Sequence, residues 1–295
     1  SRISCLCQSN ANLGVYSQKT FNLETWHHSS VHQGIRSNQP QHRYFSGLRT
    51  SGLRTMRIAL ISDIHGNLEA VVKDIDTRQI DETVCLGDIV GYGSDARECF
   101  ELTEARCSLI IMGNHELFTV LPVATRDLGG APGRGIQRAR ETLTDKQLDQ
   151  ITRLPSTGEI AGSTLVHASL NSPGDFQHII GVGHAKKHFQ FQETPLCFNG
   201  HTHSPIIFKK EKKRIDLCKP LDGIVSLNPQ SKYLINVGSV GQPRDNEPAA
   251  CYVIYDTEKC AVSFERVTYN IESAQRRFKM AGMHPSAISR IALGQ

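Results

Sequence analysis

Short apolar runs that each end in a polar residue constrain the fold of this 295-residue chain more than any other feature. Asp63 follows the first run, Asp88 the second and Asn114 the third. The pattern predicts strands and helices in alternation, with strands at about 57–62, 83–86 and 108–112 and helices at about 68–79 and 95–105. Such alternation indicates a largely parallel sheet with helices outside it. The polar residues then lie at the carboxyl ends of strands, where open α/β sheets place their sites.

Residues 117–158 interrupt this alternation and are predicted to form a small insert of one or two helices. We expect Asn67 to cap the helix at 68–79 and Thr144 to cap one in the insert. Five further strands are predicted, at 164–167, 196–199, 233–237, 251–256 and 261–268. The last two resemble a hairpin suited to the antiparallel edge of a sandwich, and residues 271–282 resemble a final amphipathic helix.

The first 55 residues differ in composition from the rest. They carry six Lys or Arg side chains and one acid, whereas the remaining 240 residues carry 27 basic and 28 acidic side chains. We expect residues 1–55 to be a disordered or non-native extension, and residues 56–295 to form the folded domain. A segment rich in Arg and Ser and poor in acids also fits an organellar targeting peptide, so that alternative stays open.

The bulk properties of the chain exclude several classes of protein. A near-neutral folded part gives no reason to expect nucleic-acid binding. No apolar stretch approaches the ~20 residues that a membrane-spanning helix needs. The nine cysteines are odd in number and contain no CxxC pair, so we expect free thiols and a cytoplasmic location.

The polar residues at the predicted strand ends form an ordered series. The series comprises Asp63, His65, Asp88, Asn114, His115, Glu116, His167, His201 and His203. One histidine near a strand is more often a satisfied polar residue than a ligand, so the weight lies in the conjunction. Asp, Asn and His together suit first-row divalent metals, and there are enough of them for two ions. Two ions ~3.5–4 Å apart form the usual clamp for in-line attack on a phosphate.

The same series carries a family resemblance. In the order D-x-H, G-D, G-N-H-E, H and G-H-x-H, it resembles the signature of the calcineurin-like metallophosphoesterase superfamily. Asp63–Ala70, Leu86–Gly93 and Asn236–Asp245 resemble motifs of its bacterial phosphodiesterase-like branch. The resemblance implies an α/β, four-layer sandwich of two mixed β-sheets flanked by helices, with a small helical insert. It also implies hydrolysis of a phosphodiester or nucleotide-like substrate by metal-activated water.

Carried over residue by residue, the resemblance implies a role for each member of the series. Asp63, His65 and His203 hold one divalent metal, Asn114, His167 and His201 hold a second, and Asp88 bridges the two. Mn, Fe, Zn, Ni and Co all suit these ligands. His115 contacts the phosphate and protonates the leaving oxygen. Glu116 either orients His115 or is exposed.

Side chains outside the ligand set are expected to shape the pocket. The candidate substrate contacts are Asn114, His115, Tyr92 and Arg244. Tyr92 either lines the pocket or packs on its own loop. Arg244 follows two glycines and a proline, in a loop whose free N–H groups could cradle an oxyanion, or else it pairs with an acid such as Asp245. The arginines of the insert (126, 134, 138 and 140) select substrates or lie on a solvated face, and His178, His184 and His188 are predicted to be surface residues.

Competing functions differ in what they require of these residues. A non-catalytic scaffold is disfavoured because all seven ligands and His115 are present. A nuclease shares the chemistry but calls for a basic stripe with aromatics, which the chain lacks. A protein Ser/Thr phosphatase and a dinucleoside polyphosphate hydrolase stay open as alternatives, although Ile89 follows Asp88 where the former carries Asp-Arg-Gly. The sequence sets no oligomeric state.

Overall fold

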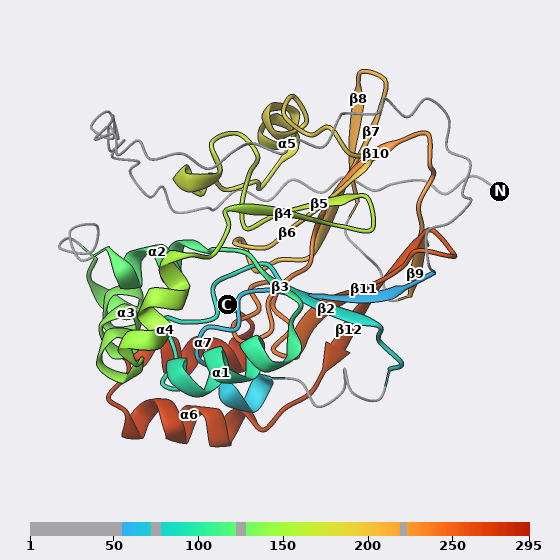
Figure 1. The fold of residues 1–295 in the computed structure, drawn as a ribbon. Coiled ribbons are helices and arrows are strands. Elements are labelled where there is room, and N and C mark those ends of the chain that lie inside the picture. Colours follow the sequence, from blue (N-terminus) through green and yellow to red (C-terminus); the bar gives the residue numbers. More distant parts are fainter. Residues whose placement is uncertain (1–54, 72–77, 122–127, 219–222) are drawn as a thin grey trace, which may run out of the picture. The chain divides into compact units, whose positions relative to one another are not determined.

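Two mixed six-stranded β-sheets form the framework of this computed structural model, which describes residues 55–71, 78–121, 128–218 and 223–295 (Figure 1). The first sheet has the order β3-β2-β1-β11-β12-β9. Its strands are β1 (Arg57–Ile61), β2 (Glu82–Cys85), β3 (Leu109–Ile110), β9 (Ile224–Ser226), β11 (Ala250–Asp256) and β12 (Ala261–Val267). The second sheet, in the order β4-β5-β6-β10-β7-β8, comprises β4 (Thr157–Ile160), β5 (Ser163–Val166), β6 (Leu196–Asn199), β7 (Ile206–Glu211), β8 (Arg214–Cys218) and β10 (Lys232–Asn236).

Helices cover the outer face of each sheet. The described residues contain seven α-helices: α1 (Ala96–Arg106), α2 (Asn114–Val120), α3 (Gly130–Thr142), α4 (Asp145–Thr152), α5 (Val182–His188), α6 (Ile271–Met280) and α7 (Pro285–Leu293). The apolar residues of β1 alternate between two cores, because successive side chains of a strand point to opposite faces. Ile58 and Leu60 pack between the sheets, while Ala59 and Ile61 pack toward the helices, in the same cluster as Phe100 of α1.

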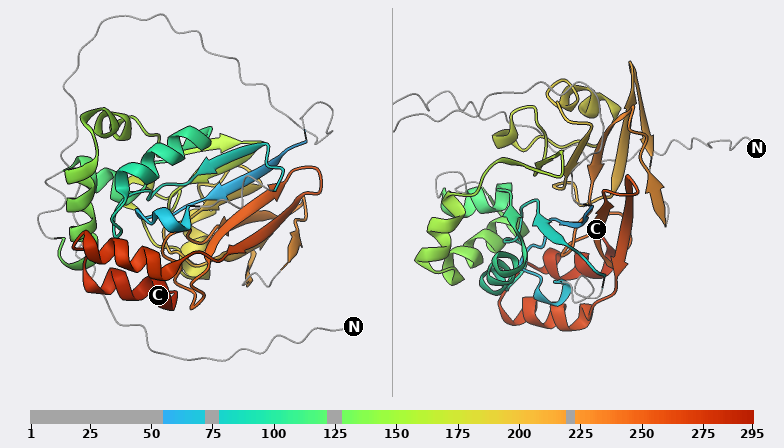
Figure 2. Two further views of the ribbon diagram at one scale, coloured as in Figure 1. Left: turned by 90° about the horizontal axis from the view of Figure 1, so that it is seen from below. Right: turned by 45° about the vertical axis from the view of Figure 1, so that its right-hand side comes forward.

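The opposite side of the second sheet completes the layering. Val166, Cys197 and Leu234 point away from the first sheet and pack with Ala185 of α5. Helices α6 and α7 lie side by side in both views of Figure 2 and share a separate apolar cluster around Phe278. The predicted four-layer α/β sandwich of two mixed sheets is therefore confirmed. In the part of the chain described, no helix is both long and apolar enough to cross a membrane.

Several predicted elements are confirmed, and the hairpin is placed differently. Strands β1, β2 and β3 pair in parallel, and β11 and β12 form the expected hairpin. The hairpin does not lie at the edge of the sheet, because β11 pairs with β1 and β9 lies beyond β12. The predicted Thr144 cap is present, with the Gln147 N–H donating to its hydroxyl over 3.3 Å.

The sequence prediction missed other elements, among them two strands and a helix, and it assigned a wrong role to Asn67. Strands β8 and β9 are largely exposed and so lack the apolar run on which strand prediction relies. Helix α7 is short, but Pro285 at its first turn and Gly294 after its end are signals for a helix. Asn67 does not cap a helix with its side chain, which instead donates to the Gly241 carbonyl over 2.9 Å.

Part of the sequence prediction lies outside the described residues. Of the helix predicted at 68–79, the first residues form a single 3₁₀ turn, η1 (Leu68–Ala70), and residues 72–77 are not described. The prediction for residues 1–55 falls almost wholly outside the described ranges, as does Arg126. Cys85, Cys197 and Cys251 are buried free thiols, as expected.

Candidate metal centre

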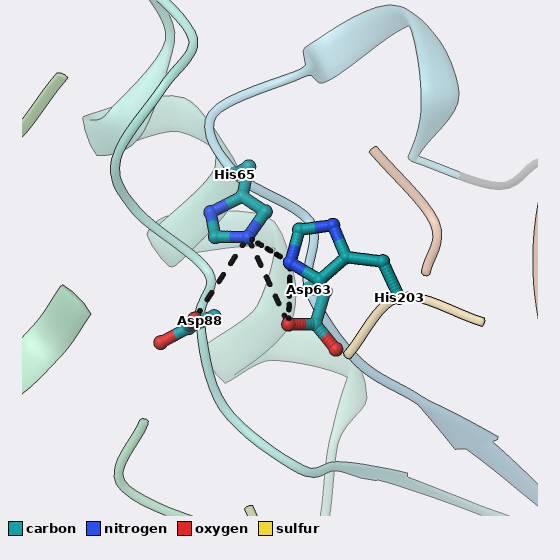
Figure 3. A group of neighbouring side chains, drawn as sticks. All are labelled: Asp63, His65, Asp88 and His203. Atoms are coloured by element: carbon teal, nitrogen blue, oxygen red, sulfur yellow. Dashed lines mark hydrogen bonds and ion pairs between the residues drawn. The ribbon is translucent and has the colours of Figure 1, made fainter. Parts of the chain in front are cut away.

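The polar residues of the series meet where strands of both sheets end. Asp63 and His65 follow β1, Asp88 follows β2, His167 follows β5, and His201 and His203 follow β6. Asn114 begins α2 directly after β3. These strand ends bring together side chains that are up to 140 residues apart in sequence (Figure 3, which draws Asp63, His65, Asp88 and His203).

Left-handed backbone turns aim these side chains inward. Asp63, His65, Asp88, His201 and His203 all have a positive φ, between 52° and 68°. Residues other than glycine rarely adopt this region, and each costs on the order of 1–3 kcal/mol where the surroundings impose it. Such strain concentrated on five clustered polar residues is typical of a functional site.

The first group of side chains comprises Asp63, His65, Asp88 and His203, all buried. The Nε2 atoms of His65 and His203 lie 3.0 Å apart. Asp63 Oδ1 is 3.2 Å from His203 Nε2 and 3.7 Å from His65 Nε2. Donor atoms from three strand ends therefore surround one point, as the ligands of one ion do (Figure 3).

The second group shares Asp88 with the first and adds His167 and His201. His167 Nε2 lies 3.3 Å from Asp88 Oδ2 and 3.2 Å from His201 Nδ1. Asn114 Oδ1 joins this group at 3.2 Å from His167 Nε2. The structure thus brings all seven predicted ligands together, in two groups that meet at Asp88.

Backbone carbonyls fix the orientation of three of these rings. His65 Nδ1 faces the Val90 carbonyl at 3.0 Å, His203 Nδ1 faces that of Gln242 at 2.6 Å, and His167 Nδ1 faces that of Leu86 at 2.7 Å. A carbonyl only accepts, so each Nδ1 carries the proton and donates, and in the neutral ring Nε2 presents a lone pair. This arrangement is how proteins orient metal-binding histidines.

The electrostatics of the cluster also favour a cation. Although burial alone would raise them, the pKa values of Asp63 and Asp88 are held below their usual range by neighbouring histidines. Burial lowers the pKa of His65 and His203, so these rings are neutral at pH 7. At His167 the effect of burial is overcome by Asp88, which raises its pKa to about 9.

The cluster fits a metal ion on three observations. The Nε2 lone pairs of His65 and His203 face each other at 3.0 Å with no proton donor between them. A cation between the two atoms would remove the repulsion between these lone pairs. Asp63 Oδ1 is buried and has no hydrogen-bond partner. A cation at the second group would take over the charge that a proton on His167 otherwise supplies. The residues present therefore suit divalent metal binding.

Comparison with known proteins agrees with this chemistry. The model of the calcineurin-like phosphoesterase superfamily domain matches residues 56–260. The chain belongs to this superfamily. It is similar to an uncharacterized protein of Methanocaldococcus jannaschii, at 35% identity over 228 residues that cover 75% of this chain and 90% of that protein.

One solved structure shows the same relationship, and a second shares the fold. A metallophosphoesterase from Sphaerobacter thermophilus is similar with a TM-score of 0.72 and 32% identity, over 82% of this chain and 100% of that one. A hypothetical protein from Pyrococcus horikoshii shares the fold, with a TM-score of 0.67, 16% identity and coverage of 81% of this chain and 98% of that one. A metallophosphoesterase fold with a candidate metal site is thus established for this superfamily member.

His115 lies at the first turn of α2, beside the first group of ligands. Its ring centroid is 4.7 Å from that of His65 and 4.8 Å from that of Tyr92. Gly91, with a φ of +88°, lies so close that a Cβ there would overlap His115 Nδ1, an atom without a hydrogen-bond partner. Burial lowers the pKa of His115 to about 4.

Of the two alternatives for Glu116, exposure is wrong, because the residue is buried. Its carboxylate accepts the backbone N–H groups of Asp88, Ile89, Val90 and Gly113, over 2.7 to 3.1 Å, rather than contacting the His115 ring. In return, Asp88 Oδ1 accepts the N–H of His115 over 2.9 Å. Glu116 therefore holds the turn that carries Asp88, a contact that strand patterns do not reveal.

Three N–H groups of the loop after β10, expected to be free for an oxyanion, are bonded within the protein. The N–H of Val240 donates to the Ser62 carbonyl, that of Gly241 to Asp63, and that of Gln242 to the Ser239 hydroxyl. The loop does lie beside the ligands, as expected, because its Gln242 carbonyl accepts the Nδ1–H of His203. In this superfamily member the loop clamps the β1 exit.

Tyr92 and Arg244 lie together beside the first group of ligands. The Tyr92 ring is 4.7 Å from His65 and 6.4 Å from His203, so Tyr92 lines the site. The Arg244 guanidinium lies 5.5 Å over the Tyr92 ring and donates to Gln242 Oε1 over 2.8 Å. Asp245 pairs with Arg266, so the alternative Arg244–Asp245 pair is not formed.

Two rings near the second group were not singled out as part of the site. His178 is exposed, as predicted, but its ring also lies 4.2 Å from that of His201. Phe176 approaches His167 at 5.8 Å and was not singled out. His184 is exposed as predicted, but His188 is buried, and its Nδ1 accepts the Leu170 N–H over 3.1 Å.

Three arginines of helix α3 in the insert contact backbone carbonyls. Arg134 donates to Ala281 and Gly282, Arg138 to Ser94, and Arg140 to Phe118 and Thr119. Gly135 of α3 packs so closely on the Gly91–Tyr92 backbone that a Cβ there would overlap Tyr92 N. The insert therefore supports the loop that carries Tyr92.

Proposed function

We propose that this protein is a dinuclear, metal-dependent phosphoesterase that hydrolyses a phosphodiester or nucleotide-like substrate. The observation that supports it most is the position of Asp88 between the two groups of imidazoles. Asp88 Oδ2 is 3.8 Å from His65 Nε2 and 3.3 Å from His167 Nε2. Asp88 Oδ1 accepts the His115 N–H, and Oδ2 is the oxygen that faces both groups.

The proposal assigns Asp63, His65 and His203 to one ion, Asn114, His167 and His201 to the other, and Asp88 to both. Mn, Fe, Zn, Ni and Co remain candidates because Asp, Asn and His suit all of them. When bound by these residues, two such ions would supply Lewis acidity toward the phosphoryl oxygens and a water made more acidic to serve as the nucleophile. The buried side chains exclude other water and keep the donor atoms in place.

His115 is proposed as the phosphate contact and the acid for the leaving oxygen. Its ring lies beside His65 and Tyr92 but outside both ligand groups. The free ring is neutral at pH 7, and a phosphate anion bound next to it would raise its pKa, since a nearby negative charge favours the protonated form. Arg244, held against Tyr92, is proposed to contact a non-bridging oxygen.

The test combines metal analysis with a substrate panel. The metal-free protein is loaded separately with Mn, Fe, Zn, Ni and Co, and bound metal is measured beside hydrolysis of phosphate monoesters and diesters. The proposal predicts two ions per chain and hydrolysis of at least one diester. Two bound ions without hydrolysis of any ester would contradict it.

A further inference from the structure

Phe176 and His178 have no part in the function proposed so far, yet they pack on the second ligand group. The Phe176 ring lies 5.8 Å from His167 and 6.4 Å from His201, and the His178 ring lies 4.2 Å from His201. Phe176 is half-buried and His178 is exposed. Both rings therefore stay accessible to a molecule that reaches the ligands.

The loop that carries these rings is held in place from both ends. Leu170 donates its N–H to the buried His188, and Asn171 Nδ2 donates to Gln177 Oε1 over 2.9 Å. Between these contacts the 3₁₀ turn η4 (Pro173–Asp175) ends at Phe176, which has a φ of 49°. A bulky residue in the left-handed region is an outlier that only its surroundings maintain. The position of Phe176 is thus imposed by the fold.

The site consequently has an aromatic wall at each end. Tyr92, with Arg244 over its ring, lies beside the first ligand group and His115. Phe176, with His178, lies beside the second group. A phosphate monoester has one organic group to place against such walls, whereas a diester has two.

We propose that Phe176 and His178 bind the non-leaving organic group of a phosphodiester and favour a planar, aromatic one. The proposal rests on the proposed function, because His115 as the acid places the leaving group on the Tyr92 side. Phe176 offers a ring face and His178 a polar edge, a pairing suited to a flat group with an aromatic ring.

Two diesters with the same leaving group test this assignment, namely 4-nitrophenyl phenyl phosphate and 4-nitrophenyl methyl phosphate. In the metal-loaded protein, Phe176→Ala should lower kcat/KM for the phenyl diester by about three- to tenfold, the usual worth of one aromatic contact. The methyl diester should change by less than about twofold. Phe176→Leu, which keeps an apolar side chain but loses the ring, should show the same selective loss for the phenyl diester as Phe176→Ala. The matched control is Phe191→Ala, at a half-exposed ring just after α5.

A second readout does not depend on turnover. Calorimetric titration of the metal-loaded wild type should show tighter binding of phenylphosphonate than of methylphosphonate, and Phe176→Ala should remove that preference. Equal losses for both diesters, or an unchanged binding preference in Phe176→Ala, would overturn the proposal. Failure of the wild type to hydrolyse any ester with two metals bound would instead overturn the proposed function itself.

Discussion

The ligand groups and the walls of the site are built in different ways. The ligands are buried or half-buried at strand ends, and backbone carbonyls of Val90, Leu86 and Gln242 fix three of the rings. The walls are loop residues, half-buried or exposed, and the contacts that place Tyr92, Phe176 and His178 beside the ligands are between rings. The candidate metal ligands are thus placed by the sheets, whereas the side chains proposed to contact the organic groups of the substrate are placed by loops.

The largest effect is expected from Asp88→Asn, which tests whether the two ligand groups act as one unit. Removing the charge between them should release metal and lower kcat/KM by roughly a thousandfold, because several kcal/mol of charge stabilisation are lost at about 1.4 kcal/mol per factor of ten. Metal analysis and a diester assay on the same preparation measure both losses. Asp149→Asn, at an exposed residue of α4, is the control. Normal metal content in Asp88→Asn would break the assignment.

His115→Asn separates chemistry from metal binding. The ring lies outside both ligand groups, so metal content should stay normal while kcat falls about 10²- to 10⁴-fold, as expected on loss of a general acid. The exposed His184 offers the matched control, His184→Asn. Unchanged turnover in His115→Asn would show that another group protonates the leaving oxygen.

Glu116→Gln tests how far the ligand groups depend on their support. The amide would place N–H groups against backbone N–H groups that now donate to the carboxylate, so the Asp88 turn should loosen. Metal affinity should fall about 10- to 100-fold, the usual effect of removing a group that orients a ligand. Titration of the metal-free protein with Mn measures it, with Glu258→Gln in the exposed β11–β12 turn for comparison. If Glu116→Gln bound Mn as tightly as the wild type, Glu116 would not be needed to position the ligands.

The smallest effect concerns the loop of Phe176 and its anchor His188. Burial lowers the pKa of His188 to about 4. In the unfolded chain the pKa of His188 is near its ordinary value of 6.5. Between pH 6.5 and pH 4 the unfolded chain therefore binds more protons than the folded protein, so the free energy of unfolding falls as the pH falls through this window. The loss is about 2 kcal/mol between pH 7 and pH 5. Urea unfolding of His188→Asn, which keeps an acceptor for Leu170 but does not titrate, should show a flatter pH profile. An identical profile would exclude His188 as the source.

Sequence patterns predicted the strand ends better than the loops, for a physical reason. A buried strand needs a continuous apolar run, so β1, β2 and β6 and the ligands after them could be read directly. Glu116 and His188 act through backbone N–H groups that tertiary structure brings to them, and no local pattern encodes such partners. Phe176 approaches the ligands only because its loop folds back in a left-handed conformation, a feature that its residue type argues against.

In the proposed function, two ions share the Asp88 carboxylate. Electron paramagnetic resonance of the metal-free protein loaded with Mn²⁺ tests it directly, because ions that share one bridging ligand couple magnetically. We expect a spin-coupled signal with two Mn²⁺ bound per chain, and loss of that signal in Asp88→Asn. A spectrum of isolated Mn²⁺ in the fully loaded wild type would contradict it.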